Sequence, residues 1–158
     1  MIYFALVLRT VVRRRRAVHD LHQLQRKLRQ VDLQAFCNLV NSQDEQYLRE
    51  RLPAREFRKV QRLRARAAAE YVRHAAANAL VMLQIAEAAR ASADGATALA
   101  AQQVVNSAVR LRLYALVVLV RLNAEIVFPG VLTYSLPFAR AYEQTLGSFA
   151  NLSQMAAA

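Results

Sequence analysis

Two histidines near the start of the chain have a spacing that could support metal chemistry. His19 and His22 lie three residues apart with Asp20 between them, so a helix would place both imidazoles on one face. The neighbouring arginines and lysine would repel a cation, and no further carboxylate or thiol lies close in sequence to complete four ligands. We therefore expect an ordinary polar flank here and no metal site.

A second pair, Glu70 and His74, invites comparison with di-iron bundles, whose helices carry Glu-x-x-His. The spacing here is one residue longer, and it occurs once, whereas such a site needs two copies and two further glutamates. Glu70 lies between Arg66 and Arg73, each within one helical turn. We expect a surface ion pair rather than a metal centre.

Nucleophilic chemistry has equally little support. Cys37 is the only cysteine, so no intramolecular disulfide can form. Its apolar neighbours favour a buried, inert thiol. Nucleophile-elbow and glycine-rich phosphate motifs are absent, and three glycines could hardly build such loops. We predict that the protein is not an enzyme, and the sequence indicates no cofactor and no small-molecule substrate.

The composition predicts long helices. Among 158 residues there are 3 Gly and 3 Pro, whereas 30 Ala, 22 Leu and 20 Arg, all strong helix formers, make up 72 positions. Apolar spacing and turn signals place the expected helices as follows: from the N-terminus to about Val40, Ser42 to about Arg51, Pro53 to about Ala91, Gly95 to about Phe128, and about Leu136 to Leu152.

Short connections favour antiparallel neighbours. The predicted fold is therefore all-α, an antiparallel bundle of three long helices plus one or two shorter ones, with an apolar N-terminal extension. The chain is predicted to consist of a membrane-proximal segment at 1–16, a helical bundle at 17–152 and a tail at 153–158. Ser42 and Glu45 have the spacing of a capping box.

Three apolar patterns indicate which faces pack. In the first helix, a stripe runs through Leu21, Leu24, Leu28, Val31, Ala35 and Leu39. The second long helix carries a stripe of mostly small residues that predicts close approach to its neighbours: Ala65, Ala68, Ala69, Val72, Ala75, Ala76, Ala79, Leu83 and Ala86. Residues 113–120 are apolar all round, which predicts burial on more than one face, and the apolar stretch 111–139 is assigned to the bundle core.

The charge is +11, with a pI of about 11.0, which favours anionic partners. Residues 1–30 hold eight basic residues and one acidic residue, so most of the excess lies there. The segment begins with eight uncharged residues, which span about 12 Å as a helix and cannot cross a hydrocarbon core of about 30 Å alone. The expected membrane contacts are Ile2, Tyr3, Phe4, Leu6, Val7, Leu8, Arg13, Arg14, Arg15 and Arg16.

An apolar stretch followed by arginines fits the asymmetry that keeps positive charge on the cytoplasmic side. Partial insertion of the apolar residues, with the arginines on anionic lipid, would hold the chain to a membrane. The alternative is that this segment packs on the bundle or on another copy of the chain. Four consecutive arginines sweep most of the way round a helix, which packing leaves unexplained.

Five further arginines form a basic stripe, with spacings of four, three, four and four that align them on one helix face: Arg51, Arg55, Arg58, Arg62 and Arg66. Such a stripe is either a solvated surface or a contact with phosphates of lipid or nucleic acid. Nucleic-acid recognition would call for stacking aromatics or a known reading motif, and no such motif is present.

The sequence therefore predicts a non-enzymatic, membrane-associated helical scaffold or interaction protein, with its body on the cytoplasmic side. An anionic membrane surface is the expected partner, and a protein partner or homo-oligomer is compatible with the pattern. The alternative is a basic helical protein that binds nucleic acid through the 51–66 face.

Overall fold

The computed structural model describes residues 28–92, 95–129 and 138–157, and every regular element among them is a helix. The prediction of an all-α fold is confirmed. The helices are α2 (Leu33–Leu39), α3 (Ser42–Arg51), α4 (Ala54–Ser92), α5 (Gly95–Val127) and α6 (Phe138–Ala157).

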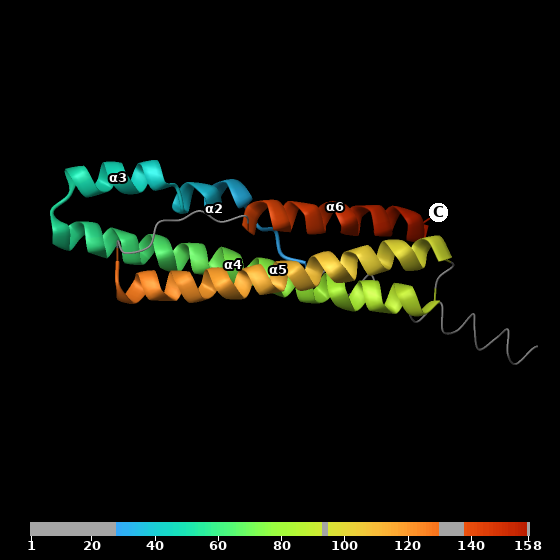
Figure 1. Cartoon of the computed structure of the whole chain (residues 1–158). Coiled ribbons are helices and arrows are strands. Elements are labelled where there is room, and N and C mark those ends of the chain that lie inside the picture. The colour runs from blue at the N-terminus through green and yellow to red at the C-terminus, as the bar shows by residue number, and fades with distance from the viewer. Residues whose placement is uncertain (1–27, 93–94, 130–137, 158) are drawn as a thin grey trace, which may run out of the picture.

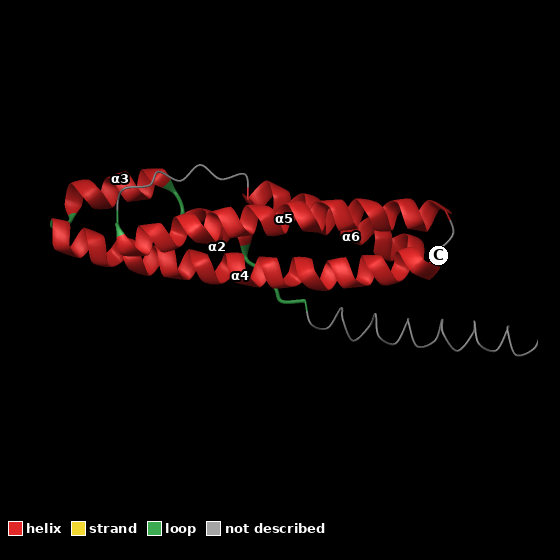
Figure 2. Ribbon diagram, turned by 60° about the horizontal axis from the view of Figure 1, so that its bottom comes forward, coloured by secondary structure: helices red, strands yellow, loops and turns green. Residues whose placement is uncertain are grey.

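The helices form an elongated bundle (Figure 1). The two long helices, α4 and α5, run antiparallel along the whole molecule, as predicted for the second and third helices. The third position of the bundle is shared: α2 and α3 lie over one half of α4, and α6 lies over the other half, against α5 (Figures 1 and 2). The short helices α3 and α6 correspond to the predicted helices at 42–51 and 136–152, whereas α2 covers only the end of the long first helix that the sequence predicts.

The small-residue stripe of α4 is the main packing surface, as predicted. Ala68, Ala69, Val72, Ala75 and Ala79 are fully buried. Because these side chains are small, the backbones of neighbouring helices can approach closely. On α5 the facing row is Ala101, Val104, Ala108, Leu111, Ala115, Val118 and Leu122.

The core divides into two clusters along the bundle. One joins α2, the middle of α4, α5 and the start of α6, with Phe36 and Phe138 in contact at 5.3 Å between ring centroids. The other joins the end of α4, the start of α5 and the end of α6. Met82, Phe149 and Leu152 are its largest buried side chains.

The prediction of a continuous first helix up to Val40 is wrong over 28–32, which are not helical. Asp32 caps a new short helix instead, since its side chain accepts a hydrogen bond from the Ala35 amide at 2.9 Å. The spacing of Leu28 and Val31 resembles a helical stripe, but a capping carboxylate at position 32 favours a helix start. The predicted contacts of Leu21 and Leu24 lie outside the described residues.

The capping box at the start of α3 is also displaced by one residue. Asn41 is the cap, and its side chain accepts from the Gln43 amide at 3.0 Å, so Ser42 is already the first helical residue. Asn is as good a cap as Ser, and it comes first in the chain. Glu45 instead pairs with Arg49 at 2.9 Å.

The last helix runs to Ala157, five residues beyond the predicted end at Leu152. Phe149 and Leu152 bury their side chains in the core, which stabilises α6 past Gly147. The predicted cap and first turn, at Ser135 and Pro137, lie outside the described residues.

Candidate functional site

The second half of α5 leaves a row of large apolar side chains exposed. We call it the apolar face, and its members are between 43 and 61% exposed: Val109, Leu113, Leu116, Val117, Val120 and Val127. Because their spacings are three, four and seven residues, apart from Val117 at the edge, they align on the side of α5 opposite the core. From Val109 to Val127 the row extends about 27 Å at the rise of a helix.

This exposure corrects the prediction that residues 113–120 are buried on more than one face. The stretch 111–139, predicted as bundle core, contributes only one side of α5 and Phe138 to the core, and 130–137 lie outside the described residues. Only Ala115 and Val118 are buried within 113–120. Two helices of the bundle, α4 and α6, pack against α5. Both contact the side of α5 that carries its buried residues. No described element covers the other side, so an apolar surface is left open to solvent.

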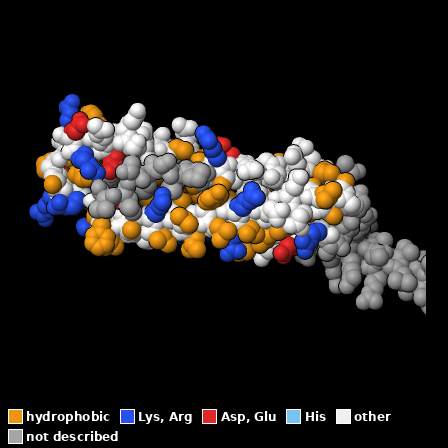
Figure 3. Space-filling model, in the orientation of Figure 1, with side chains coloured by type: hydrophobic (Ala, Val, Ile, Leu, Met, Phe, Trp, Pro, Cys, Tyr) orange, Lys and Arg blue, Asp and Glu red, His pale blue; other side chains and the backbone are white. Residues whose placement is uncertain are grey.

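The charges around the apolar face are positive. Arg110, Arg112 and Arg121 are exposed on α5, whereas Glu125, the only acidic residue of this helix, is 1% exposed. Figure 3 shows hydrophobic side chains gathered along α5 with Lys and Arg side chains between them. The surface is therefore apolar and cationic at once, and α5 exposes no carboxylate on it.

By length and composition, α5 is the one helix among the described residues that could cross a membrane. Core helices of soluble proteins pass the same test, but they are mostly buried, whereas 28% of the most apolar stretch of α5 is buried. The uncharged run between Arg112 and Arg121 is eight residues, about 12 Å of helix, against about 30 Å of hydrocarbon. The uncharged run is therefore shorter than the hydrocarbon core of a bilayer.

The basic stripe lies at one end of the bundle, and all five of its arginines are exposed. Arg62 adjoins the end of α5: its Nε donates a hydrogen bond to the carbonyl oxygen of Ile126 at 3.1 Å. Arg51 lies over the Tyr47 ring, 5.3 Å from its centroid. The spacing predicted one helix face for all five, which is wrong for Arg51, because Arg51 ends α3 whereas the other four lie on α4. The hydrogen bond of Arg62 brings the stripe on α4 beside the end of the apolar face.

A fixed polar contact links α4 to the chain that precedes α2. The Asn78 side chain is buried, accepts from the Arg29 amide at 2.9 Å and donates to the Arg29 carbonyl at 2.7 Å. It also donates to the Tyr142 hydroxyl of α6 at 2.9 Å. Burial raises the pKa of the Tyr142 phenol, and the hydrogen bond from Asn78 opposes that rise.

Another polar contact fastens α2 and α3 to α4. The guanidinium of Arg64 donates to the carbonyl oxygens of Asn38, Leu39 and Asn41, at 3.1 to 3.3 Å. The Asn38 and Leu39 carbonyls lie at the end of α2, and the Asn41 carbonyl, which also accepts from the Glu45 amide, lies at the start of α3. Sequence reasoning missed both Asn78 and Arg64, because a single polar residue in a helix does not reveal its distant partner.

The sequence also predicts a surface ion pair at Glu70 and a buried thiol at Cys37. Glu70 forms the expected surface ion pair, with Arg73. Cys37 is exposed, so the prediction of a buried thiol is wrong, because α2 turns Phe36 inward instead. No group of three His, Cys, Asp or Glu side chains gathers within the described part of the chain.

The predicted membrane contacts of the N-terminal segment, at 2–8 and 13–16, lie outside the described residues, as do His19 and His22. Comparison of the chain with protein-family models, with curated proteins and with solved structures finds no match.

Proposed function

We propose that this protein is a non-enzymatic, membrane-associated helical protein whose body lies along an anionic lipid surface and serves there as a scaffold or interaction surface. The observation that carries the proposal is the apolar face of α5, exposed along about 27 Å of helix and bordered by arginines. Such a face is typical of helices that lie in the membrane interface, where apolar side chains enter the boundary between headgroups and acyl chains.

The arginines are compatible with this position. Arg110, Arg112 and Arg121 have long aliphatic stems, so their charged ends can reach the headgroups while the stems lie along apolar surface. Anionic lipids attract basic residues near the surface by about 1 kcal/mol each. The positive charge of these arginines favours the cytoplasmic leaflet, because this leaflet contains the anionic lipids and because positively charged segments are retained on the cytoplasmic side.

The N-terminal segment 1–16 provides a second attachment in this proposal. Its apolar residues and four arginines combine partial insertion with charge attraction, and two weak attachments together hold a protein more firmly than either alone. A protein partner or a second copy of the chain would then bind to the faces of the bundle that point away from lipid.

Liposome flotation tests the proposal. The full chain is expected to float with vesicles that contain phosphatidylglycerol. Replacement of Leu113, Leu116 and Val120 by Gln is expected to weaken binding by about 1,000-fold, since three apolar side chains moved from water contribute about 4.5 kcal/mol or more together. A matched control replaces three apolar residues that are exposed on other helices, Leu63, Leu80 and Met155, by Gln.

The control is expected to float like the unchanged chain. A chain that begins at Ala17 is expected to float more weakly than the full chain, because it lacks the second attachment. If the full chain stays with the soluble fraction, membrane association is refuted. If the α5 variant floats as well as the control, the apolar face is not the contact surface.

A further inference from the structure

The first two turns of α4 carry a cluster of cations beside the end of α5. Arg55, Glu56, Arg58, Lys59 and Arg62 surround one hollow, and all five are exposed. We call the four cations the basic end. Within the described chain, none of these five side chains forms a salt bridge. The cluster therefore has a net charge of +3, and no salt bridge among the described residues offsets it.

The basic end is joined to the apolar face. The hydrogen bond from Arg62 to the Ile126 carbonyl satisfies one of the last carbonyls of α5 and fixes α4 against that end. The next two residues, Val127 and Phe128, are 60 and 65% exposed. Cationic and large apolar side chains thus meet at one end of the bundle.

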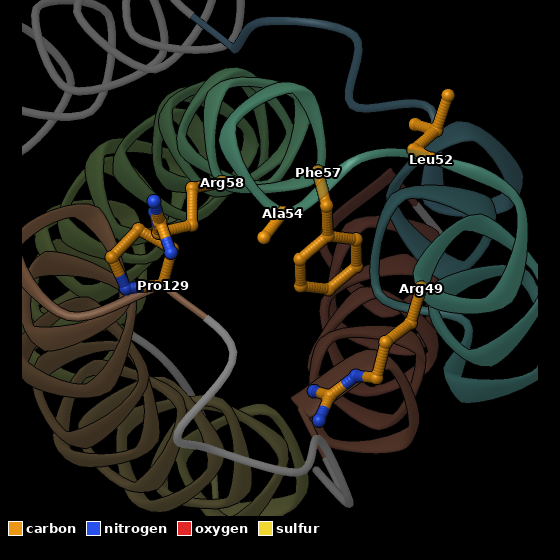
Figure 4. Close-up of a pocket in the computed structure, with 6 residues that line it drawn as sticks. All are labelled: Arg49, Leu52, Ala54, Phe57, Arg58 and Pro129. Atoms are coloured by element: carbon orange, nitrogen blue, oxygen red, sulfur yellow. The ribbon is translucent and has the colours of Figure 1, made fainter.

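A second hollow, of about 250 Å³, opens at the same end (Figure 4). Its lining is apolar apart from two arginines, Arg49 from α3 and Arg58 from α4, which lie on opposite sides of the opening with Phe57 between them. Arg49 lies over the Phe57 ring at 5.2 Å and pairs with Glu45, so it is held in place. Arg58 lines both hollows.

We propose that the basic end binds the phosphates of anionic phospholipids while the apolar face lies in the same bilayer. This inference rests on the proposed membrane association and adds the headgroup chemistry and the position of the contact. A phospholipid presents an anionic phosphate next to an ester-linked apolar region, and this end of the bundle presents guanidinium groups next to Phe57 and Phe128. Guanidinium groups bind phosphate oxygens in bidentate fashion.

Charge complementarity favours lipid over a second copy of the chain. Two apolar faces brought together would oppose exposed arginines to exposed arginines, with no exposed carboxylate on α5 to pair with them. Nucleic acid would use the cations but leave the row of Leu and Val side chains without a contact, since its bases are bound by stacking and hydrogen bonds. An anionic bilayer accounts for both features.

The test compares vesicles of phosphatidylcholine alone with vesicles that also contain phosphatidylglycerol, using the full chain. One variant combines Arg55→Gln, Arg58→Gln and Lys59→Gln, and it leaves Arg62 in place to hold α5. The matched control combines Arg73→Gln, Arg90→Gln and Arg140→Gln, three exposed cations elsewhere on the bundle with the same change in charge. Glutamine is a good helix former, so both variants keep their helices, and circular dichroism verifies this.

At about 1 kcal/mol for each cation near the surface, the basic-end variant is expected to bind the anionic vesicles about 100-fold more weakly. The control is expected to lose less than about fivefold, because its cations lie outside the contact in this account. Binding of the unchanged chain to anionic vesicles is expected to weaken as salt is added, whereas any binding to phosphatidylcholine alone stays constant.

Equal losses in both variants would overturn the inference, since net charge rather than this site would then determine binding. Equal binding of the unchanged chain to both kinds of vesicle would also overturn it and leave membrane association through the apolar face intact. If the basic-end variant loses affinity for duplex DNA or RNA but not for vesicles, the site is a nucleic-acid contact.

Discussion

Asn78 joins three parts of the chain that are far apart in sequence. Its buried side-chain amide binds both backbone groups of Arg29 and the hydroxyl of Tyr142. A buried polar group costs free energy when it is left without a partner, so this network stabilises the fold only while it is complete. Asn78 therefore fixes where the chain before α2 and the helix α6 meet α4.

The phenol of Tyr142 makes this network sensitive to alkaline pH. Burial raises its pKa in the folded protein above the value of about 10 that it has in the unfolded chain. Its contribution to stability is therefore complete below pH 10 and is lost as the pH rises through the folded pKa. We expect the melting temperature to fall above about pH 10.

The matched variant is Tyr142→Phe, measured by thermal unfolding over the same pH series. It should be less stable at neutral pH by about 1 kcal/mol, because Asn78 loses one acceptor. Its melting temperature should decline less at alkaline pH than that of the unchanged protein. Parallel declines in the two proteins would show that other groups cause the pH dependence.

At the scale of elements, α6 contains a glycine at a position where alanine would make the helix more stable. Gly147 lies in the interior of the helix, is exposed, and has no heavy atom of a neighbour within 4 Å of an added Cβ. A glycine in a helix interior is about 0.5 to 1 kcal/mol less favourable than alanine, because the unfolded chain loses more freedom.

Gly147→Ala is therefore expected to raise the free energy of unfolding by about 0.5 to 1 kcal/mol, measured by urea denaturation. Gly95→Ala is the control. Gly95 also has open space around it but is the first residue of α5, where the helix is less constrained, so a smaller gain is expected. A loss of stability in Gly147→Ala would contradict the open environment of this residue.

Which elements could be predicted from sequence depends on whether the signal is local. The alanine stripe of α4 and the start of α5 at Gly95 are local patterns, and both were predicted correctly. Burial of α5 was not, because an apolar stretch shows that a surface avoids water but not whether the fold supplies a partner for it. The displaced cap at Asn41 shows that neighbouring residues of similar capping strength compete for a helix start. The helix start at Asp32 was missed because apolar spacing continues through it.

The same distinction between local patterns and distant contacts applies to the candidate site. The alignment of Arg55, Arg58, Arg62 and Arg66 on one face of α4 follows from their spacing alone, whereas Arg51 ends α3 and is separated from them by the break at Leu52 and Pro53. Its position beside the end of α5 does not, because that depends on a contact between residues 62 and 126. The apolar face was present in the sequence as residues 113–120 but was attributed to the core.

At the scale of the whole molecule, the two halves of the third bundle position meet at one aromatic contact. Phe36 of α2 and Phe138 of α6 lie 5.3 Å apart between centroids, and both are buried in the larger core cluster. The short helices α2 and α3 have few other apolar anchors, since Phe36 is the only buried residue of α2.

Phe36→Ala is expected to reduce the free energy of unfolding by about 3 to 5 kcal/mol, through lost burial and the cavity that remains. Hydrogen exchange should show faster exchange of the amides of α2 and α3. The amides of α6 near Phe149 should change less, because they belong to the other core cluster. Uniform acceleration along the chain would show instead that the two halves unfold as one unit.

The hydrogen bonds between Asn78 and Arg29 also determine how a tether would act on the bundle. Asn78 lies well inside α4, 24 residues after its start and 14 before its end. Arg29 is therefore bound away from both ends of the bundle. A rod that is tethered near its middle tends to lie parallel to a surface, whereas a rod that is tethered at one end can also stand perpendicular to it. Attachment through the N-terminal segment would therefore favour an orientation in which the long axis of the bundle is parallel to the bilayer.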